Sequence, residues 1–188
     1  MKIRMEQPQF QLMDEDQLSV ELIDAQYDLK KTRGQKNAKS LLILVNGIEL
    51  AGKGEAVKQL REWVDPRYLR VKADAPQVAG PKQTLWQPYA RFIPAEGQIM
   101  VLFGNWYSDL LSSAMQASNP ITNTQFNHYL QEMQAFEQDL KNNHVDVVKV
   151  WFDLSWKALQ KRLDAMDPSE AHWHQLHGLD WRNRKQYD

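Results

Sequence analysis

Apolar residues recur along this chain in two alternating spacings. Within residues 13–31, leucines and an alanine recur every three or four positions, which predicts an amphipathic helix. Residues 41–45 form an unbroken aliphatic run, which is typical of a strand buried on both faces of a parallel sheet. From residue 54 the apolar positions again share one helical face, until Pro66 ends the helix. A helix, a strand and a second helix are therefore expected before Pro66.

The alternation continues beyond Pro66. Residues 170–188 are polar and lack a clear period, so no element is predicted there. Trp151 lies inside an apolar run and is expected in the core. Strands that alternate with helices predict an α/β fold with a parallel sheet and right-handed crossovers. The remaining expected elements are strands at 68–72, 99–103 and 146–154 and helices at 125–141 and after Ser155.

Length and composition indicate one compact domain. The chain has 188 residues, of which 43% are hydrophobic and 25% charged, and it contains no cysteine. Disulfides, thiolate metal sites and cysteine nucleophiles are thereby excluded. No apolar run approaches the roughly 20 residues of a membrane span, and no apolar leader begins the chain, so we expect a cytoplasmic protein without membrane contact. We expect residues 1–40 to form a helical segment and connector, and residues 41–188 to form the main domain.

Positive charge is concentrated in one part of the chain. Residues 53–91 hold eight basic and four acidic residues, whereas residues 92–188 hold eight basic and twelve acidic residues. A local basic stretch on a chain of net charge −1 suits a small or linear polyanion better than duplex DNA. Lys58, Arg61 and Arg67 are its candidate phosphate-binding cations. The alternative is that they are ordinary solvated surface charges.

The most specific motif follows the first predicted strand and reads Gly47-Ile48-Glu49-Leu50-Ala51-Gly52-Lys53-Gly54. A Walker A loop requires two glycines separated by four residues, then Lys and then Ser or Thr, between a strand and a helix. Only the last position differs. Gly47, Gly52 and Gly54 allow backbone N–H groups to surround phosphate oxygens, and Lys53 is the candidate contact to the terminal phosphates. The alternative is a glycine-rich turn that binds no phosphate.

A metal ligand for this loop must come from another position. Gly54 stands where a hydroxyl would hold Mg²⁺, so Glu49 is the nearest candidate ligand. Phosphoryl-transfer enzymes of this kind usually place a carboxylate at the end of a neighbouring strand. Residues 103–108 contain no acid. Asp153 follows the last predicted strand, where it suits an ordinary strand-end or N-cap role at least as well.

Further segments, in a fixed order, complete a family pattern. They are Asp65-Pro66-Arg67, Ala75-Pro76, Leu85-Trp86, residues 94–98, Phe136-Glu137, residues 148–151 and Gln160-Lys161-Arg162. Together with the loop they resemble the polyphosphate kinase 2 family, phosphotransferases that use inorganic polyphosphate as phosphate donor or acceptor. The resemblance covers residues 13–181 and is strongest to the N-terminal half of members with two fused domains, which phosphorylate AMP to ADP. It implies a P-loop kinase-like three-layer sandwich, dependence on Mg²⁺ and a charge-stabilising role for Arg162.

The departures from the family pattern fall at chemical positions. Glu49 replaces the loop aspartate, and Glu55 replaces a glycine and brings negative charge toward a bound phosphate. The family's Phe-Asp-Arg-Ser-Trp-Tyr becomes residues 103–107, Phe-Gly-Asn-Trp-Tyr, so an acidic metal ligand and a phosphate-contacting arginine are missing. The family also continues with a further helix and strand beyond Asp188, so the sheet is expected to be incomplete.

Two functions from different classes stay open. The first is Mg²⁺-dependent transfer of a phosphoryl group from polyphosphate to AMP, with Lys53, Glu49 and Arg162 as the catalytic residues. The second is a non-catalytic domain that binds polyphosphate or packs against an active partner domain. The expected partners are polyphosphate, AMP or ADP, and a second family domain in the same chain or further copies in a homo-oligomer. An ATP-dependent nucleotide kinase is disfavoured because no Ser or Thr follows Lys53.

Overall fold

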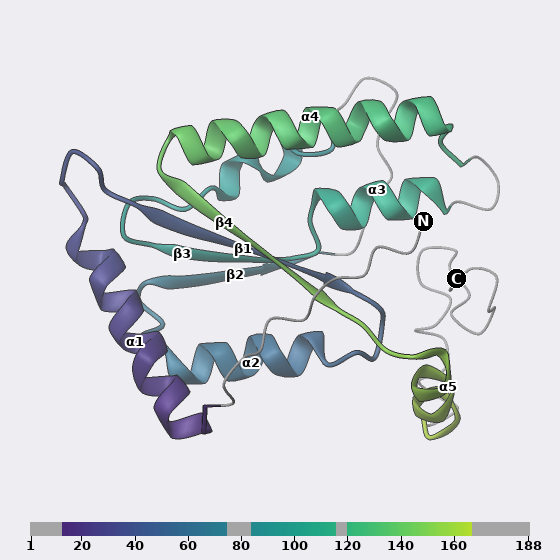
Figure 1. Ribbon diagram of the computed structural model, residues 1–188, viewed down its shortest axis with the longest axis horizontal. Coiled ribbons are helices and arrows are strands. Elements are labelled where there is room, and N and C mark those ends of the chain that lie inside the picture. Colours follow the sequence, from purple (N-terminus) through teal and green to yellow (C-terminus); the bar gives the residue numbers. More distant parts are fainter. Residues whose placement is uncertain (1–12, 75–83, 116–119, 167–188) are drawn as a thin grey trace.

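The computed structural model describes residues 13–74, 84–115 and 120–166. The Ala75-Pro76 segment and the polar tail at 170–188 lie outside the described residues. Helices cover both faces of one sheet, with α1 and α2 on one face and α3 and α4 on the other (Figure 1). The elements are α1 (Glu15–Lys31), β1 (Ser40–Gly47), α2 (Lys53–Trp63), β2 (Leu69–Ala73), the 3₁₀ helix η1 (Gln87–Phe92), β3 (Ile99–Phe103), α3 (Trp106–Ala114), α4 (Asn123–Asn142), β4 (Val145–Phe152) and α5 (Trp156–Asp164).

The sheet has four strands in the order β2-β3-β1-β4, and every pairing is parallel. In the register, Ile43 of β1 lies beside Val101 of β3 on one side and Val148 of β4 on the other. Helical crossovers join strands that are neighbours in sequence. The predicted α/β class, parallel sheet and three-layer architecture are therefore confirmed. The carboxyl ends of all four strands meet at one edge of the sheet, from which the β1–α2 loop (residues 48–52) departs.

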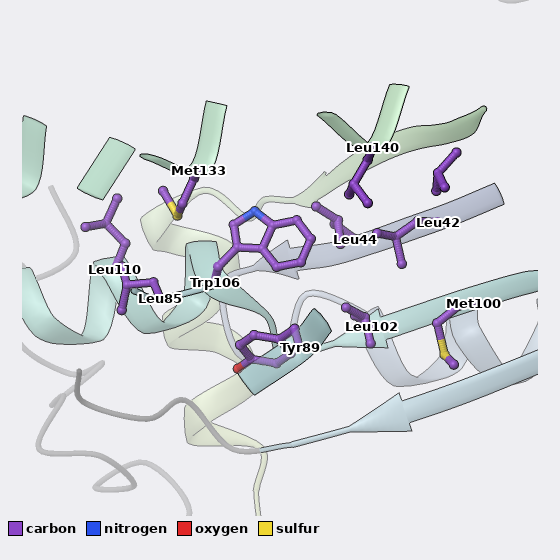
Figure 2. Close-up of a cluster of buried hydrophobic side chains, with 11 residues drawn as sticks. Leu42, Leu44, Leu85, Tyr89, Met100, Leu102, Trp106, Leu110, Met133 and Leu140 are labelled. Carbon is purple, nitrogen blue, oxygen red and sulfur yellow. The ribbon is translucent and has the colours of Figure 1, made fainter. Parts of the chain in front are cut away.

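The largest of the three hydrophobic clusters among the described residues lies between the sheet and the α3/α4 layer. Trp106 stands at its centre with no exposed surface, between Leu44 of β1 and Met133 of α4 (Figure 2). The rings of Trp86 and Phe136 stack with centroids 4.3 Å apart at the border of this cluster. Trp106 is therefore a core residue.

Polar side chains define where several helices begin. The Ser155 hydroxyl accepts a hydrogen bond from the Ala158 N–H at 3.2 Å, which confirms the expected cap of α5. Thr122 and Gln125 form a reciprocal capping box at the start of α4. These local interactions explain why the predicted starts of these two helices agree with the structure to within a few residues.

Two parts of the fold differ from the sequence expectation. The structure contains two helices, η1 and α3, in segments where the sequence predicted none. In α3 the buried set includes Asp109, Ser112 and Ser113, so polar residues occupy the inward face and hide the helical period. The expected burial of Trp151 is wrong, because 55% of this residue is exposed. Among the described strands β4 is an edge strand, and its carboxyl half is not covered on both faces.

Candidate functional site

The β1–α2 loop is shaped by residues with left-handed backbone. Gly47 has φ 128°, and a β-carbon there would lie 2.0 Å from the carbonyl oxygen of Phe152 in β4. Gly52 has φ 93° and forms the N-cap of α2. Leu50 has φ 62°, which is uncommon for a residue with a side chain. Gly47 is therefore needed for close strand packing, whereas Gly52 is needed for the turn into the helix.

Lys53, the first residue of α2, places its ammonium group against this loop. Its side chain is only 8% exposed, and Nζ donates hydrogen bonds to the Gly47 carbonyl at 2.7 Å and to Glu49 Oε1 at 3.1 Å. Nζ also lies 5.8 Å from the centroid of the Phe103 ring at the end of β3. A buried cation held at the mouth of a strand-to-helix turn is suited to bind an anion entering the loop.

Helix α5 packs directly onto the loop. Ile48 forms a small buried cluster with Leu159 and Leu163 of α5. From the same helix, Arg162 donates a hydrogen bond through Nη1 to the carbonyl of Leu50. The structure thus brings Arg162 to the loop that contains Glu49 and that the Lys53 side chain contacts. The three residues expected to be catalytic lie together, although more than 100 residues separate Lys53 from Arg162 in the sequence.

The other expected phosphate ligands are farther along or beyond α2. Gly54 lies in its first turn and has open space around its α-carbon. Lys58 pairs with Glu62 at 3.8 Å on the exposed side of the helix, and Arg61 lies exposed in its last turn. These two side chains are accessible to a polyanion that extends from the loop along α2.

The structure does not bring Arg67 to the loop. Arg67 precedes β2 at the amino end of the parallel strands, whereas the loop leaves their carboxyl end. Its guanidinium binds the Asp65 carboxylate, with Nη2 2.6 Å from Oδ2. Hydrogen bonds from Arg67 lower the pKa of Asp65 to about 2, and those same bonds raise the pKa of Arg67. Sequence proximity suggested a shared site, but helix α2 separates the two ends.

Neutral groups occupy the end of β3, where an acid was missing from the sequence. Asn105 is fully buried, and its side chain caps α3 by accepting from the Tyr107 N–H at 3.1 Å. Its amide nitrogen lies 3.3 Å from the Leu102 carbonyl oxygen. Nearby, the Ser108 hydroxyl donates to the Asn46 side chain at 2.9 Å and ties α3 to β1. Asn105 and Ser108 therefore connect elements of the fold.

Two carboxylates near the ends of the strands were not selected as site residues from the sequence. Asp74 follows β2, and its carboxylate lies 2.7 Å from Lys72 Nζ. Asp109 in α3 is buried and accepts a hydrogen bond from the Tyr89 hydroxyl at 2.8 Å. Burial and this neighbouring carboxylate raise the pKa of Tyr89. The position of Asp74 directly after a predicted strand was the available signal; no sequence signal identified the partner of Asp109.

The carboxylate set suits a magnesium ion that is held mainly by its substrate. Mg²⁺ is typically bound by one or two carboxylates together with phosphate oxygens and waters. Glu49 has a side chain that is 56% exposed at the mouth of the loop, and only Oε1 contacts Lys53. Asp153 follows β4 and is also exposed. Glu49 therefore fits the role of a single protein ligand to a phosphate-bound metal.

The fold and the loop define the class of protein. A parallel sheet of this order, with a glycine-bounded loop between β1 and α2 and a lysine at the helix start, is the P-loop kinase-like arrangement. The sequence profile of the family described as polyphosphate kinase 2 (PPK2) matches residues 11–188. The chain belongs to the polyphosphate kinase 2 family.

Named relatives agree with this assignment, and a solved structure shares the fold. A polyphosphate:AMP phosphotransferase from Acinetobacter johnsonii is 72% identical over 177 residues, which are 94% of this chain and 37% of the relative. The protein of that name from Pseudomonas aeruginosa is 35% identical over 172 residues, 89% of this chain and 33% of the relative. The chain thus spans about a third of these relatives. The crystal structure of polyphosphate kinase 2 from Arthrobacter aurescens shares the fold, with a TM-score of 0.72 and 21% identity over 100% of this chain and 67% of that one.

Among the helices in the described part of the chain, none is long and apolar enough to cross a membrane.

Proposed function

We propose that this chain is a polyphosphate-dependent phosphotransferase domain that converts AMP to ADP. The observation that carries the proposal is the placement of Lys53, a buried ammonium group held at the β1–α2 loop in a member of the polyphosphate kinase 2 family. The similarity to proteins named polyphosphate:AMP phosphotransferase supports AMP as the acceptor. A cytoplasmic location fits these intracellular substrates.

The reaction is an in-line displacement at the terminal phosphorus of polyphosphate. A phosphate oxygen of AMP forms the new P–O bond, and the bond between the terminal phosphorus and its bridging oxygen breaks. Polyphosphate shortened by one unit leaves with the electron pair on that oxygen. Lys53 and the backbone N–H groups of the loop hold the transferred group. Arg162, already bound to the loop at Leu50, stabilises charge that develops on the phosphate oxygens. No covalent enzyme intermediate is needed.

Glu49 would hold Mg²⁺ at the mouth of the loop. When bound, the ion neutralises charge on the phosphate chain and orients its oxygens. The protein's part is to present one exposed carboxylate there, beside the ammonium group of Lys53. Lys58 and Arg61 extend the positive surface along α2 for the remainder of the chain of phosphates.

The test is ADP formation from AMP, polyphosphate and Mg²⁺, measured by anion-exchange chromatography for the purified chain and its Lys53→Ala variant. Polyphosphate-dependent ADP that disappears in the variant is the expected result. ATP as the preferred donor would contradict the proposal and favour an ordinary nucleotide kinase. Circular dichroism confirms that both proteins are folded before rates are compared.

A second candidate is a non-catalytic domain that binds polyphosphate and supports an active partner domain. The observation that favours it is the end of β3, where residues 103–107 lack the acid and the arginine of the family pattern and the fully buried Asn105 caps α3 instead. The greater length of the relatives is consistent with a second domain in the same protein. Polyphosphate binding without ADP formation, in a folded chain, would favour this candidate over the first.

A further inference from the structure

Glu49 and Lys53 form an ion pair inside the loop that is expected to receive an anion. The Lys53 side chain is 8% exposed, so its position is fixed by packing and by the Gly47 carbonyl. The Glu49 side chain is 56% exposed and has only one oxygen on Lys53. The carboxylate is therefore the partner that is free to move away, because most of its surface already contacts solvent.

This ion pair makes the loop a poor receptor for a bare polyanion. Glu49 neutralises the one cation within residues 47–55, and Glu55 adds a further negative charge in the first turn of α2. A phosphate group that binds Lys53 must displace the Glu49 carboxylate from it. The negative charges of the carboxylates repel the negative charges of the phosphates. This repulsion raises the free energy of the bound state, because solvent screens charges near the surface only in part.

A divalent cation reverses the effect of Glu49. Mg²⁺ prefers oxygen ligands and is commonly bound by one carboxylate together with phosphate oxygens. When Glu49 contacts a Mg²⁺ ion that is bound to polyphosphate, the carboxylate attracts this complex instead of repelling the polyanion. The Lys53 ammonium group then becomes available to phosphate. We propose that Glu49 makes the loop selective for magnesium-loaded polyphosphate over the metal-free polyanion by alternating between Lys53 and the metal. The inference rests on the proposed function, because it takes the loop to be the polyphosphate site.

Isothermal titration calorimetry tests this selectivity. Sodium polyphosphate of defined length is titrated into the protein with and without MgCl₂, and the two affinities are compared. Without Mg²⁺, Glu49→Gln is expected to bind about 2- to 10-fold more tightly than the unchanged protein, since the Glu49 carboxylate no longer competes with phosphate for Lys53. With Mg²⁺, the unchanged protein gains more affinity than Glu49→Gln does. Equal or weaker metal-free binding by Glu49→Gln, or an equal gain from Mg²⁺ in both proteins, would overturn the inference.

Two controls separate the contact from general charge effects. Glu55→Gln removes the same charge from the same loop region without touching Lys53, so the gain from Mg²⁺ should stay as in the unchanged protein. Hexamminecobalt(III) screens phosphates but offers no coordination position to a carboxylate, so it should improve binding equally in the unchanged and Glu49→Gln proteins. A larger gain in the unchanged protein with this ion would count against direct metal contact.

A third variant distinguishes failure of this inference from failure of the proposed function. Binding that is lost in a folded Lys53→Met variant, combined with equal Mg²⁺ gains in the unchanged and Glu49→Gln proteins, overturns only the alternation of Glu49. Binding that Lys53→Met leaves unchanged shows that polyphosphate does not use the loop, and it overturns the proposed function and the inference together.

Discussion

The α-carbon of Gly47 lies against the backbone of Phe152, so closely that a β-carbon on Gly47 would stand 2.0 Å from the Phe152 carbonyl oxygen and 2.6 Å from its nitrogen. The two residues are register partners at the carboxyl ends of β1 and β4. The Ile48 N–H also donates to the Phe152 carbonyl at 3.0 Å. The loop is thus joined to β4 at its first residue.

Gly47→Ala is expected to lower the free energy of unfolding by about 1–3 kcal/mol, because the backbone of β4 must shift and φ is unfavourable for alanine. It should also weaken polyphosphate binding, since the loop begins at this point. Urea unfolding and calorimetric titration measure the two effects. Gly54→Ala is the matched control for stability: its added carbon meets open space in a helix, so stability should not fall. Equal stability of Gly47→Ala and the unchanged protein would contradict this close packing of Gly47 against Phe152.

The buried indole of Trp106 connects the core to a polar network. Its Nε1 donates to Glu137 Oε1 at 3.1 Å, and Lys149 Nζ lies 2.8 Å from Oε2 of the same carboxylate. Trp106→Phe is expected to cost about 1–3 kcal/mol in urea unfolding, through a lost hydrogen bond and a small cavity. Trp151→Phe makes the same change at an exposed position and should cost less than about 0.5 kcal/mol. Similar losses in both variants would contradict the central place of Trp106.

The Asp65–Arg67 pair should make stability depend on pH in the acid range. The pKa of Asp65 is lowered from 3.8 to about 2 in the folded protein, so the pair stabilises the fold above pH 3.8 and loses this effect as pH falls toward 2. Arg67→Leu removes the pair, so its stability deficit relative to the unchanged protein should shrink between about pH 4 and pH 2. Guanidinium unfolding of both proteins at several pH values measures this deficit in the free energy of unfolding. A deficit that stays constant over this range would exclude the ionic contribution.

Replacement of Arg162 or of Arg67 by Gln removes the same charge at two different places, the β1–α2 loop and the amino end of the strands. Arg162→Gln is expected to weaken polyphosphate binding by roughly tenfold, because a charge-assisted contact at the loop is lost. Arg67→Gln should leave the affinity nearly unchanged, since this side chain lies at the amino end of the strands. The effect of Arg162→Gln should shrink as salt is raised. Equal weakening by both variants would indicate a response to net charge alone.

The sequence determined the order and type of most elements. Continuous apolar runs at β1 and β3 reported burial on both faces, and polar caps such as Ser155 marked helix starts. These signals are local, because a strand's hydrophobicity and a cap's hydrogen bond depend on residues a few positions apart. The glycine spacing and Lys53 likewise identified the candidate loop before any fold was known.

Only the tertiary structure decided which distant residues share that loop. Chain order alone could not place Arg162 on the Leu50 carbonyl or Arg67 at the opposite end of α2, because both depend on how helices pack on the sheet. It also could not reveal that Glu49 pairs with Lys53. In the sequence, each residue has its own role at a phosphate site, Lys53 as a phosphate contact and Glu49 as a metal ligand. Sequence spacing fixes which residues are neighbours along a helix or strand, whereas the parallel arrangement of the strands fixes which of their ends meet.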